Sequence, residues 1–501
     1  MLPAAAALGL GLWGIDRGGG MWRDESVTYQ VAHRSLPDLL GLLGDIDAVH
    51  GLYYLLMHAV FGVWDGGLLA LRLPSVVATA VAAAGVGAVG RRLAGTRAGV
   101  LSGLAFPLLP LVQQYAQEGR SYAMVCAAVS WATYLLLCGA AGGGRRVWAG
   151  YEGLLAVACW LHEFAALALV AHGVTLWRSG VPRAVRRSWA RAALVVAAAV
   201  LPLAAVSAGQ ADRQLGWLGR PGAGEWLLFA AVSGAGVLLV LLCRAPGRGP
   251  ARRPAAGPVT PAGLALPLLV VPAGLLMTVS LVKPWYVDRY VLYGYAGLAL
   301  LAGTALDRVL DRLPDRAPER MPGAGRVRRP VAVCLTVVCP VTVLLPWSQA
   351  VRSPESRKDD VVAVAETVRA TAVRGDAVLF MPARRREWLL SFPSLRAGVR
   401  DLALDRPPAA SRTLQGTELP AAEIRRRILA EDRIVALTDP AGEPLDALGP
   451  EAVKRETLTA YFRVCGTKRV HGAQVVVYAR PGRCGRPAGP SPGDGPVAVG
   501  R

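Results

Sequence analysis

Residues 192–206 read Ala-Ala-Leu-Val-Val-Ala-Ala-Ala-Val-Leu-Pro-Leu-Ala-Ala-Val, without a charged side chain. They belong to an apolar run at 190–208, and about 20 such residues cross the hydrocarbon core of a bilayer as a helix. Comparable runs recur along the chain, at 2–15, 68–90, 98–114, 121–140, 147–161, 164–177, 226–243, 262–282, 289–306 and 331–347. The sequence therefore predicts an all-α polytopic membrane protein with about eleven transmembrane helices.

Composition and charge agree with a membrane protein. Of the 501 residues 53% are hydrophobic, and the formal net charge is +20. The basic residues stand in short clusters between apolar runs, which is typical of cytoplasmic loops. We therefore interpret the excess charge as a sign of topology and expect no nucleic-acid partner.

The segment 50–64 decides the orientation. If it spans the membrane, Arg91 and Arg92 lie outside; if it is a helix on the outer surface, every basic cluster lies inside. The positive-inside rule favours the surface helix. We expect a multi-pass protein of the plasma membrane with a cytoplasmic N-terminus and an extracytoplasmic C-terminal domain.

Three regions follow from this map. Residues 1–348 would form the transmembrane domain, with a first outer loop at 16–67, and the Pro/Gly-rich tail 483–501 would be disordered. Between them, residues 349–482 would form a small α/β domain. The predicted elements of that domain are helices at 359–373, 421–431 and 450–460, strands at 376–381 and 433–438, and a hairpin at 461–470 and 473–480. Outside the cell, Cys465 and Cys484 could pair.

Polar residues from separate parts of the chain converge on the outer face in this topology. They are Asp24, Glu25, His50, Gln117, Glu118, Arg120, His162, Glu163, Lys283, Asp288 and Arg289. Ionisable side chains at the membrane are costly unless they have a function. This convergence is the main reason to expect an active site there.

Each group has a functional and a structural interpretation. Asp24 and Glu25 could provide a general base, or they could begin a surface helix near Ser26. Glu118 and Arg120 could pair in a turn, or the guanidinium could hold a phosphate oxygen.

The groups later in the chain also have two interpretations each. His162 and Glu163 could simply be the polar residues that a tip between two helices needs. The aromatic residues near Lys283 and Arg289 could form an interfacial belt. Cations on the outer rim, however, suit a lipid-linked phosphate. A metal site of His50, His58 and His162 is a further alternative, although no ligand spacing supports it.

The order of these motifs resembles a known family. The motifs are Asp24-Glu25, His50-Gly-Leu-Tyr-Tyr-Leu, Arg72-Leu-Pro-Ser75, Gln114-Tyr-Ala-Gln-Glu-Gly-Arg-Ser-Tyr122 and Asp288-Arg-Tyr290. Residues 1 to about 347 resemble the GT-C membrane glycosyltransferases, and among them the bacterial relatives of protein O-mannosyltransferases and aminoarabinose transferases, a glycosyltransferase 39-like family. The chain departs from the family's His-Pro-Pro-Leu at His50-Gly-Leu, and from its Thr-His-Tyr at His162-Glu163.

The resemblance implies an enzyme that uses a polyprenyl-phosphate sugar on the outer face. Asp24 matches the acidic position held to be catalytic, with Glu25 beside it. The residues expected to bind the donor phosphate or substrate are Glu118, Arg120, Tyr122, Lys283, Arg289, Tyr290, His50, Tyr53, His162 and Glu163.

The expected reaction is inverting transfer of a hexose such as mannose, or of a pentose. The acceptor would be an extracytoplasmic cell-wall glycan, lipid or protein. No cofactor is expected with certainty, and a divalent cation stays an open alternative. A transporter or flippase of lipid-linked precursors is the alternative function, but transporters usually place charges near mid-membrane and contain inverted repeats.

Overall fold

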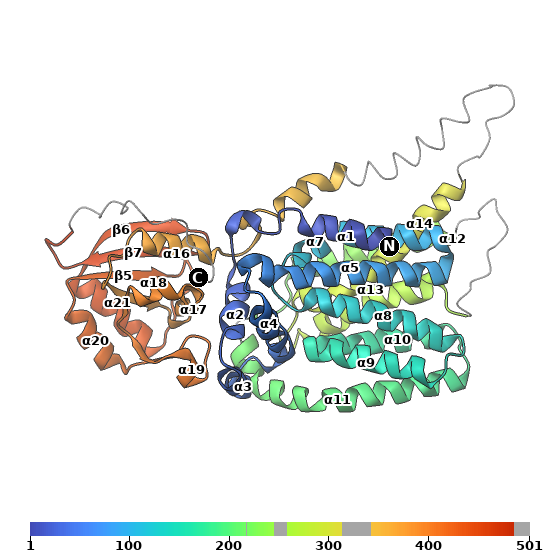
Figure 1. The fold of residues 1–501 in the computed structure, drawn as a ribbon, viewed down its shortest axis with the longest axis horizontal. Helices are drawn as coiled ribbons and strands as arrows, with labels where there is room; N and C mark the ends of the chain where they lie inside the picture. The colour runs from blue at the N-terminus through green and yellow to red at the C-terminus, as the bar shows by residue number, and fades with distance from the viewer. Residues whose placement is uncertain (217, 245–257, 313–341, 485–501) are drawn as a thin grey trace, which may run out of the picture. The chain divides into compact units, whose positions relative to one another are not determined.

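The computed structural model describes residues 1–216, 218–244, 258–312 and 342–484, which divide into two compact units (Figure 1). The helical unit comprises Met1–Trp13, Ala48–Tyr53 and Arg72–Val351, and the mixed unit comprises Gly14–Asp47, Tyr54–Leu71 and Arg352–Arg501. Most of the predicted first outer loop therefore folds with the C-terminal region. That grouping could not be read from the predicted boundary at 348.

Helices in the described residues coincide with ten of the eleven predicted apolar runs. They are α1 (Leu2–Leu12), α5 (Gly67–Ala94), α6 (Thr96–Leu108), α7 (Pro110–Ala116), α8 (Tyr122–Ala140), α9 (Arg145–Leu161), α10 (Leu167–Arg178), α11 (Arg183–Leu215), α12 (Ala223–Arg244), α13 (Pro261–Val279) and α14 (Tyr295–Arg312). Most of the run at 331–347 lies outside the described residues. The all-α polytopic class is confirmed.

Five of these helices are long and apolar enough to cross a membrane, namely α5, α8, α11, α12 and α13. Others, such as the 11 residues of α1 and the 13 of α6, are shorter than a full span. Large apolar side chains on α11 and α12 are exposed, among them Leu201 at 66% and Leu227 at 71%. An exposed apolar face of this kind suits contact with lipid.

Small residues bring the helices of the helical unit together. A Cβ on Gly303 of α14 would lie 2.2 Å from the backbone N of Ser102 in α6. A Cβ on Gly103 of α6 would lie 2.7 Å from Pro3 in α1. Membrane helices rely on such close approach because lipid provides little hydrophobic drive for their association. Figure 1 shows the long helices of this unit running side by side.

The mixed unit contains α2 (Arg23–Ala32), α3 (Leu36–Asp45), most of α4 (Gly51–Val63) and an α/β region. Its main sheet has the order β2-β1-β5-β7-β6. The strands are β1 (Ala377–Met381), β2 (Arg400–Asp401), β5 (Arg433–Thr438), β6 (Arg463–Val470) and β7 (Ala473–Ala479). β1 pairs in parallel with β2 and β5, and β7 pairs antiparallel with β5 and β6.

Every second residue of β1 and of β5 contributes to the core on one side of the sheet. Leu379 and Ile434 lie on one face with Ile424 and Ile428 of α20 (Ala421–Leu429) and Leu458 of α21 (Gly449–Tyr461). The helix α16 (Val361–Arg369) also packs against the sheet, at β6 and β7. The predicted order of helices, strands and hairpin is therefore confirmed.

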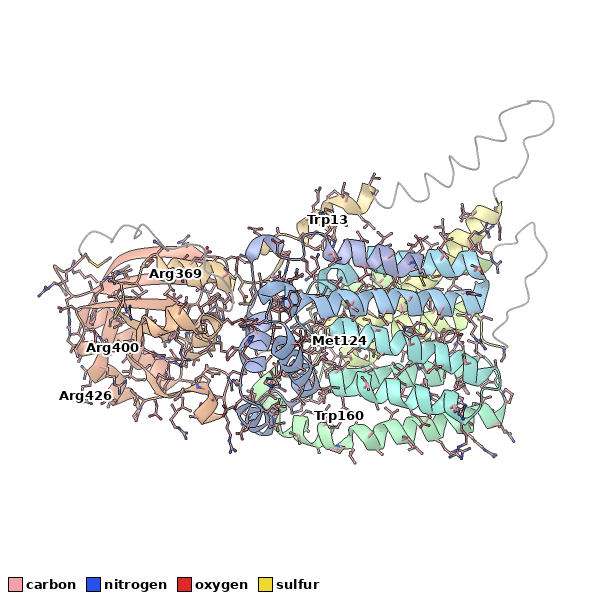
Figure 2. The ribbon with its side chains drawn as sticks, viewed as in Figure 1. Trp13, Met124, Trp160, Arg369, Arg400 and Arg426 are labelled. Carbon is pink, nitrogen blue, oxygen red and sulfur yellow. A yellow bond between two sulfur atoms is a disulfide. The ribbon has the colours of Figure 1, made fainter. Side chains whose placement is uncertain are left out.

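Residues 383–418 contain elements that were not predicted. They are η6 (Ala383–Arg386), α17 (Glu387–Leu390), α18 (Pro393–Ala397), α19 (Pro408–Ser411), β2, and a small pair of β3 (Leu404–Arg406) with β4 (Thr417–Glu418). Each is too short to give a hydrophobic period. Figure 2 labels two surface arginines of the mixed unit, Arg400 and Arg426. Arg400 pairs with Glu431 at 2.8 Å and Arg426 with Glu423 at 2.7 Å.

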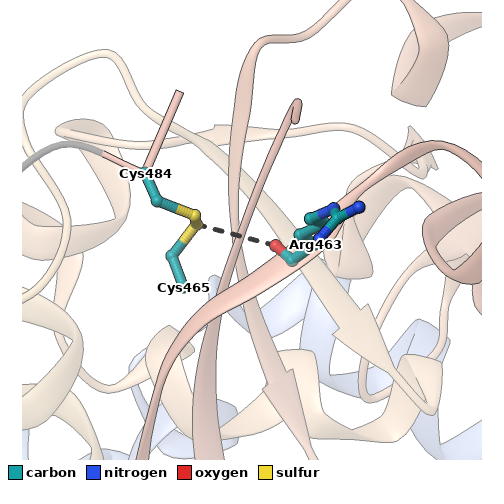
Figure 3. Close-up of a disulfide and its surroundings, with 3 residues drawn as sticks. All are labelled: Arg463, Cys465 and Cys484. Carbon is teal, nitrogen blue, oxygen red and sulfur yellow. Dashed lines mark hydrogen bonds between the residues drawn. A yellow bond between two sulfur atoms is a disulfide. The ribbon is translucent and has the colours of Figure 1, made fainter. Parts of the chain in front are cut away.

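Cys465 and Cys484 form a disulfide with a Cα–Cα distance of 5.4 Å (Figure 3). The bond ties β6 to the segment after β7. The pairing that the sequence left conditional is therefore made. Residues 485–501, which include nearly all of the predicted disordered tail, lie outside the described residues.

Candidate active site

The two acids of the first outer loop lie in the first turn of α2 but differ in environment. Glu25 is completely buried and forms an ion pair with Arg17, which is buried as well. The side chain of Asp24 is 14% exposed, and its Oδ1 lies 3.7 Å from Nε of Arg23. A buried carboxylate needs its counter-ion, whereas a partly exposed one can meet a substrate. The geometry favours Asp24 as the reacting acid, and the catalytic roles of both stay predictions.

Arg17 adopts a backbone conformation that is rare for a side-chain-bearing residue. Its φ is +50°, and Gly18 and Gly19 follow with φ of +64° and +86°. The left-handed turn over η1 (Arg17–Gly19) is unfavourable for an arginine by itself. In this conformation the side chain of Arg17 forms the buried ion pair with Glu25.

In the helical unit, His162 lies at the centre of an aromatic cluster. Its ring centroid is 4.4 Å from that of Tyr290, 5.8 Å from that of Tyr122 and 5.9 Å from that of His50. These residues come from η2 (Ala48–His50), the start of α8, the end of α9, and η4 (Asp288–Gly294). Four segments that are distant in sequence thus meet at one place.

Arg289 provides the cation of this cluster. Its Nε donates to the hydroxyl of Tyr122 at 3.0 Å, and its guanidinium carbon lies 5.8 Å from the ring centroid of Tyr122 and 5.7 Å from that of Tyr290. Asp288 Oδ1 accepts from the Arg289 backbone N–H at 2.7 Å and from the Tyr115 hydroxyl at 3.3 Å. These contacts fix the plane of the guanidinium.

The Glu118–Arg120 turn connects α7 to α8 and is held from α5. The hydroxyl of Ser75 lies 2.6 Å from the carbonyl oxygen of Glu118 and 3.1 Å from that of Arg120. Nε2 of Gln117 donates to the carbonyl oxygen of Gly11 at 2.8 Å. Both Glu118 and Arg120 are buried, so this turn belongs to the packed interior of the unit.

The remaining predicted site residues have different surroundings. Glu163 accepts a hydrogen bond from Ser207 at 2.6 Å, and Tyr53 is buried, whereas Lys283 is exposed. Within the part of the chain that is described, no group of three or more His, Cys, Asp or Glu could hold a metal ion. The alternative of a site made by His50, His58 and His162 gains no support from this.

Some members of the cluster were missed from the sequence. The ring of Phe164 lies 5.5 Å from that of Tyr290, and the ring of Tyr115 lies 5.6 Å from that of Tyr122. Tyr115 lies inside the motif Gln114–Tyr122, and Phe164 directly follows His162-Glu163. Their aromatic character next to a polar motif was the available signal.

The mixed unit also contains a buried acid that the sequence did not single out. Glu387 begins α17, which packs against α2. Its pKa is raised from 4.5 to about 7, chiefly because the carboxyl group is buried; the guanidinium groups of Arg23 and Arg384 oppose the rise, and the carboxylates of Asp47 and Asp24 add to it. The folded protein therefore holds a proton on Glu387 that the unfolded chain releases.

We expect this acid to make stability pH-dependent. Because its folded pKa is raised, its contribution is present below pH 4.5 and is lost as the pH rises to about 7. Glu387→Gln should flatten the decline in thermal midpoint over this window, measured on the full chain in detergent. The exposed Glu443→Gln is the matched control and should leave the decline as in the wild type.

Comparison with known proteins places the fold. No family model matches the chain, and no curated protein matches it. The solved structure of ArnT from Cupriavidus metallidurans bound to undecaprenyl phosphate matches with a TM-score of 0.58 and 14% identity, over 97% of this chain and 99% of that one. The apo state of the same enzyme gives 0.59 and 14%, over 95% and 97%.

A more distant structure has the same architecture. The oligosaccharyltransferase of Archaeoglobus fulgidus, in complex with Zn and sulfate, matches with a TM-score of 0.50 and 11% identity. That match covers 87% of this chain and 67% of the archaeal one. The resemblance seen in the motifs is confirmed by structure, and this chain has the fold of the GT-C membrane glycosyltransferases.

Proposed function

We propose that this protein is an integral membrane glycosyltransferase that takes a sugar from a polyprenyl-phosphate donor. The observation that carries the proposal is the buried cluster of Arg289, Tyr122, His162 and Tyr290, assembled from separate segments of the helical unit. The structural likeness to ArnT, which was solved with undecaprenyl phosphate, supports a lipid phosphate as the ligand.

The donor phosphate would be held by Arg289 and Arg120. A guanidinium can give two parallel hydrogen bonds to phosphate oxygens, and both arginines are largely removed from water. Charge develops on the phosphate as its bond to the sugar breaks. Fixed cations that meet this charge stabilise the transition state. The rings of Tyr122, Tyr290 and His162 would offer flat faces to the sugar or the first prenyl carbons.

Asp24 would act as the general base. Its carboxylate takes the proton from an acceptor hydroxyl, and the hydroxyl oxygen attacks the anomeric carbon. The anomeric carbon–phosphate bond breaks, and polyprenyl phosphate leaves with the electron pair. Direct attack inverts the anomeric centre. Glu25, paired with Arg17, would fix the first turn of α2.

The sugar is proposed to be a hexose such as mannose, or a pentose, and the acceptor an extracytoplasmic glycan, lipid or protein. Lipid extracted from the purified protein and analysed by mass spectrometry tests the donor. A polyprenyl-phosphate sugar should co-purify with the wild type and be depleted in Arg289→Ala. Its absence from wild-type preparations, or equal amounts in both, would contradict the proposal.

The C-terminal domain is proposed to lie outside the cell. The Cys465–Cys484 disulfide supports this, because such bonds persist in oxidising compartments. A phosphatase fused after Arg501 should be active and a β-galactosidase fused there inactive. Fusions after Gly180, in the basic connection between α10 and α11, should give the reverse pattern as the control. Strong galactosidase activity at the C-terminus would overturn the topology.

A further inference from the structure

The helix that carries Asp24 is capped by a residue from the C-terminal region. The first N–H groups of a helix have no partner within it. Trp22 precedes α2, and its indole has a donor but no acceptor with which to cap them. Oδ1 of Asp359 accepts the N–H of Arg23 at 2.7 Å. A carboxylate at this place also interacts favourably with the helix dipole.

The adjacent aspartate, Asp360, binds Met21, which lies two residues before the start of α2. Asp360 Oδ1 accepts the N–H of Met21 at 3.4 Å, and the carbonyl oxygen of Met21 accepts the N–H of Val361 at 2.7 Å. The same Oδ1 caps α16, accepting from Val362 at 3.0 Å and Ala363 at 3.2 Å. One carboxylate thereby connects the starts of α2 and α16.

A third contact lies one helical turn further on. The hydroxyl oxygens of Ser26 and Ser391 are 2.8 Å apart and share a hydrogen bond, and both residues are buried. The Ser391 hydroxyl also lies 3.3 Å from the carbonyl oxygen of Ser26. Asp24 and Glu25 therefore lie between Arg23 and Ser26, and each of these two residues is hydrogen-bonded to the C-terminal region.

The turn between β6 and β7 sets the position of the aspartates. The carbonyl oxygen of His471 accepts the N–H of Asp360 at 3.1 Å. Gly472 follows with a φ of +82°, and a Cβ built there would be 2.3 Å from Cβ of Asp359. Only glycine fits this turn as long as Asp359 stays where it caps α2.

We propose that Asp359, Asp360 and Ser391 are positioning residues for the transfer reaction, which hold the start of α2 so that Asp24 points in a productive direction. This inference rests on the proposed function. It assigns the C-terminal region a part in the reaction. Asp24 directly follows the capped residue, and loss of the cap would let the first turn fray and its side chain reorient.

The test compares Asp359→Ala with Asp359→Asn in the full chain. The asparagine keeps a carbonyl oxygen that can accept the Arg23 N–H, and the alanine does not. Hydrogen–deuterium exchange of peptides covering residues 21–26 should be faster in the alanine variant and close to wild type in the asparagine variant. Asp405→Ala removes an exposed carboxylate of the same unit and should change nothing.

Transfer kinetics provide the second readout. Asp359→Ala should lower kcat by roughly 10- to 100-fold, the order expected for a misplaced reacting group, with a much smaller change in donor KM. Asp359→Asn should retain most of the wild-type kcat. A purely structural loss would lower the amount of active enzyme in both and would not be rescued by the amide.

Gly472→Ala reaches the same contact from the other side. The new Cβ should displace Asp359 and reproduce both effects. Gly442→Ala is the matched control, since Gly442 has a φ of +90° but a Cβ there would meet no described atom within 4 Å. It shares the backbone strain without the displacement.

The outcomes separate this inference from the proposed function. Inactive Asp24→Asn together with normal kcat in Asp359→Ala would overturn the positioning role alone. Unchanged exchange at residues 21–26 in Asp359→Ala would overturn it as well. Full activity of Asp24→Asn would overturn the base assignment, and with it any positioning of a catalytic Asp24, whatever the exchange shows.

Discussion

Asp24→Asn is expected to lower sugar transfer by at least about 100-fold, the lower range for loss of a general base. The amide has the shape of the carboxylate but cannot take a proton. Because the Asp24 side chain is 14% exposed and its neighbours hold the backbone, the substitution should leave the folded protein in the membrane. Initial rates with a polyprenyl-phosphate sugar measure the effect.

Two control variants separate base loss from damage to the fold. Asp45→Asn changes an exposed acid at the end of α3 and should keep the wild-type rate. Glu25→Gln should instead reduce the yield and thermal midpoint, because it removes the charge of a carboxylate that forms a buried ion pair with Arg17. A rate above about a tenth of wild type in Asp24→Asn would show that Asp24 is not the base.

Arg289→Lys is expected to weaken transfer markedly although the charge is kept. The lysine cannot reproduce the Nε hydrogen bond to Tyr122, and it lacks the planar cation whose central carbon lies 5.8 Å and 5.7 Å from the ring centroids of Tyr122 and Tyr290. An ammonium also acts as a point charge, where a guanidinium grips two phosphate oxygens. We expect roughly a 10-fold or greater loss of kcat/KM for the donor, of the order of one charged hydrogen bond, and a larger loss for Arg289→Ala.

The argument from guanidinium geometry applies to the buried Arg120 as well, and both arginines should be assayed over a range of donor concentrations. Arg308→Lys, an exposed position in α14, is the control and should be silent. Tyr122→Phe removes the hydroxyl that accepts from Arg289 and should give a smaller loss. Unchanged donor dependence in both Arg→Lys variants would contradict phosphate binding by these two guanidinium groups.

The helices and strands of this protein could be predicted where their runs of apolar residues are long enough to be recognised. The apolar runs of the helical unit and the apolar strands at 377–381 and 433–438 agree with the structure. Residues 383–418 were missed because their elements are two to five residues long. Such elements are fixed by tertiary contacts, for example Arg386 with Asp401 and Glu418.

The contacts within the candidate site were predicted only in part. The one-sided topology predicted His50, His162 and Arg289 on a common face, the family resemblance added Tyr122, and in the structure these residues form one cluster. The burial of Glu25 with Arg17 and the capping of α2 by Asp359 could not be foreseen. The latter joins residues 336 positions apart, and no local pattern reports such a contact.

The most direct test of the account follows the sugar itself. The purified full chain is reconstituted in vesicles with polyprenyl phosphate that carries a labelled sugar, mannose and a pentose in turn, and with envelope material from cells that lack the protein. Label should move from the lipid into the envelope material with inversion at the anomeric carbon, with the wild type and not with Asp24→Asn. Label that stays on the lipid with both donors, or that moves equally with both proteins, would contradict the central claim.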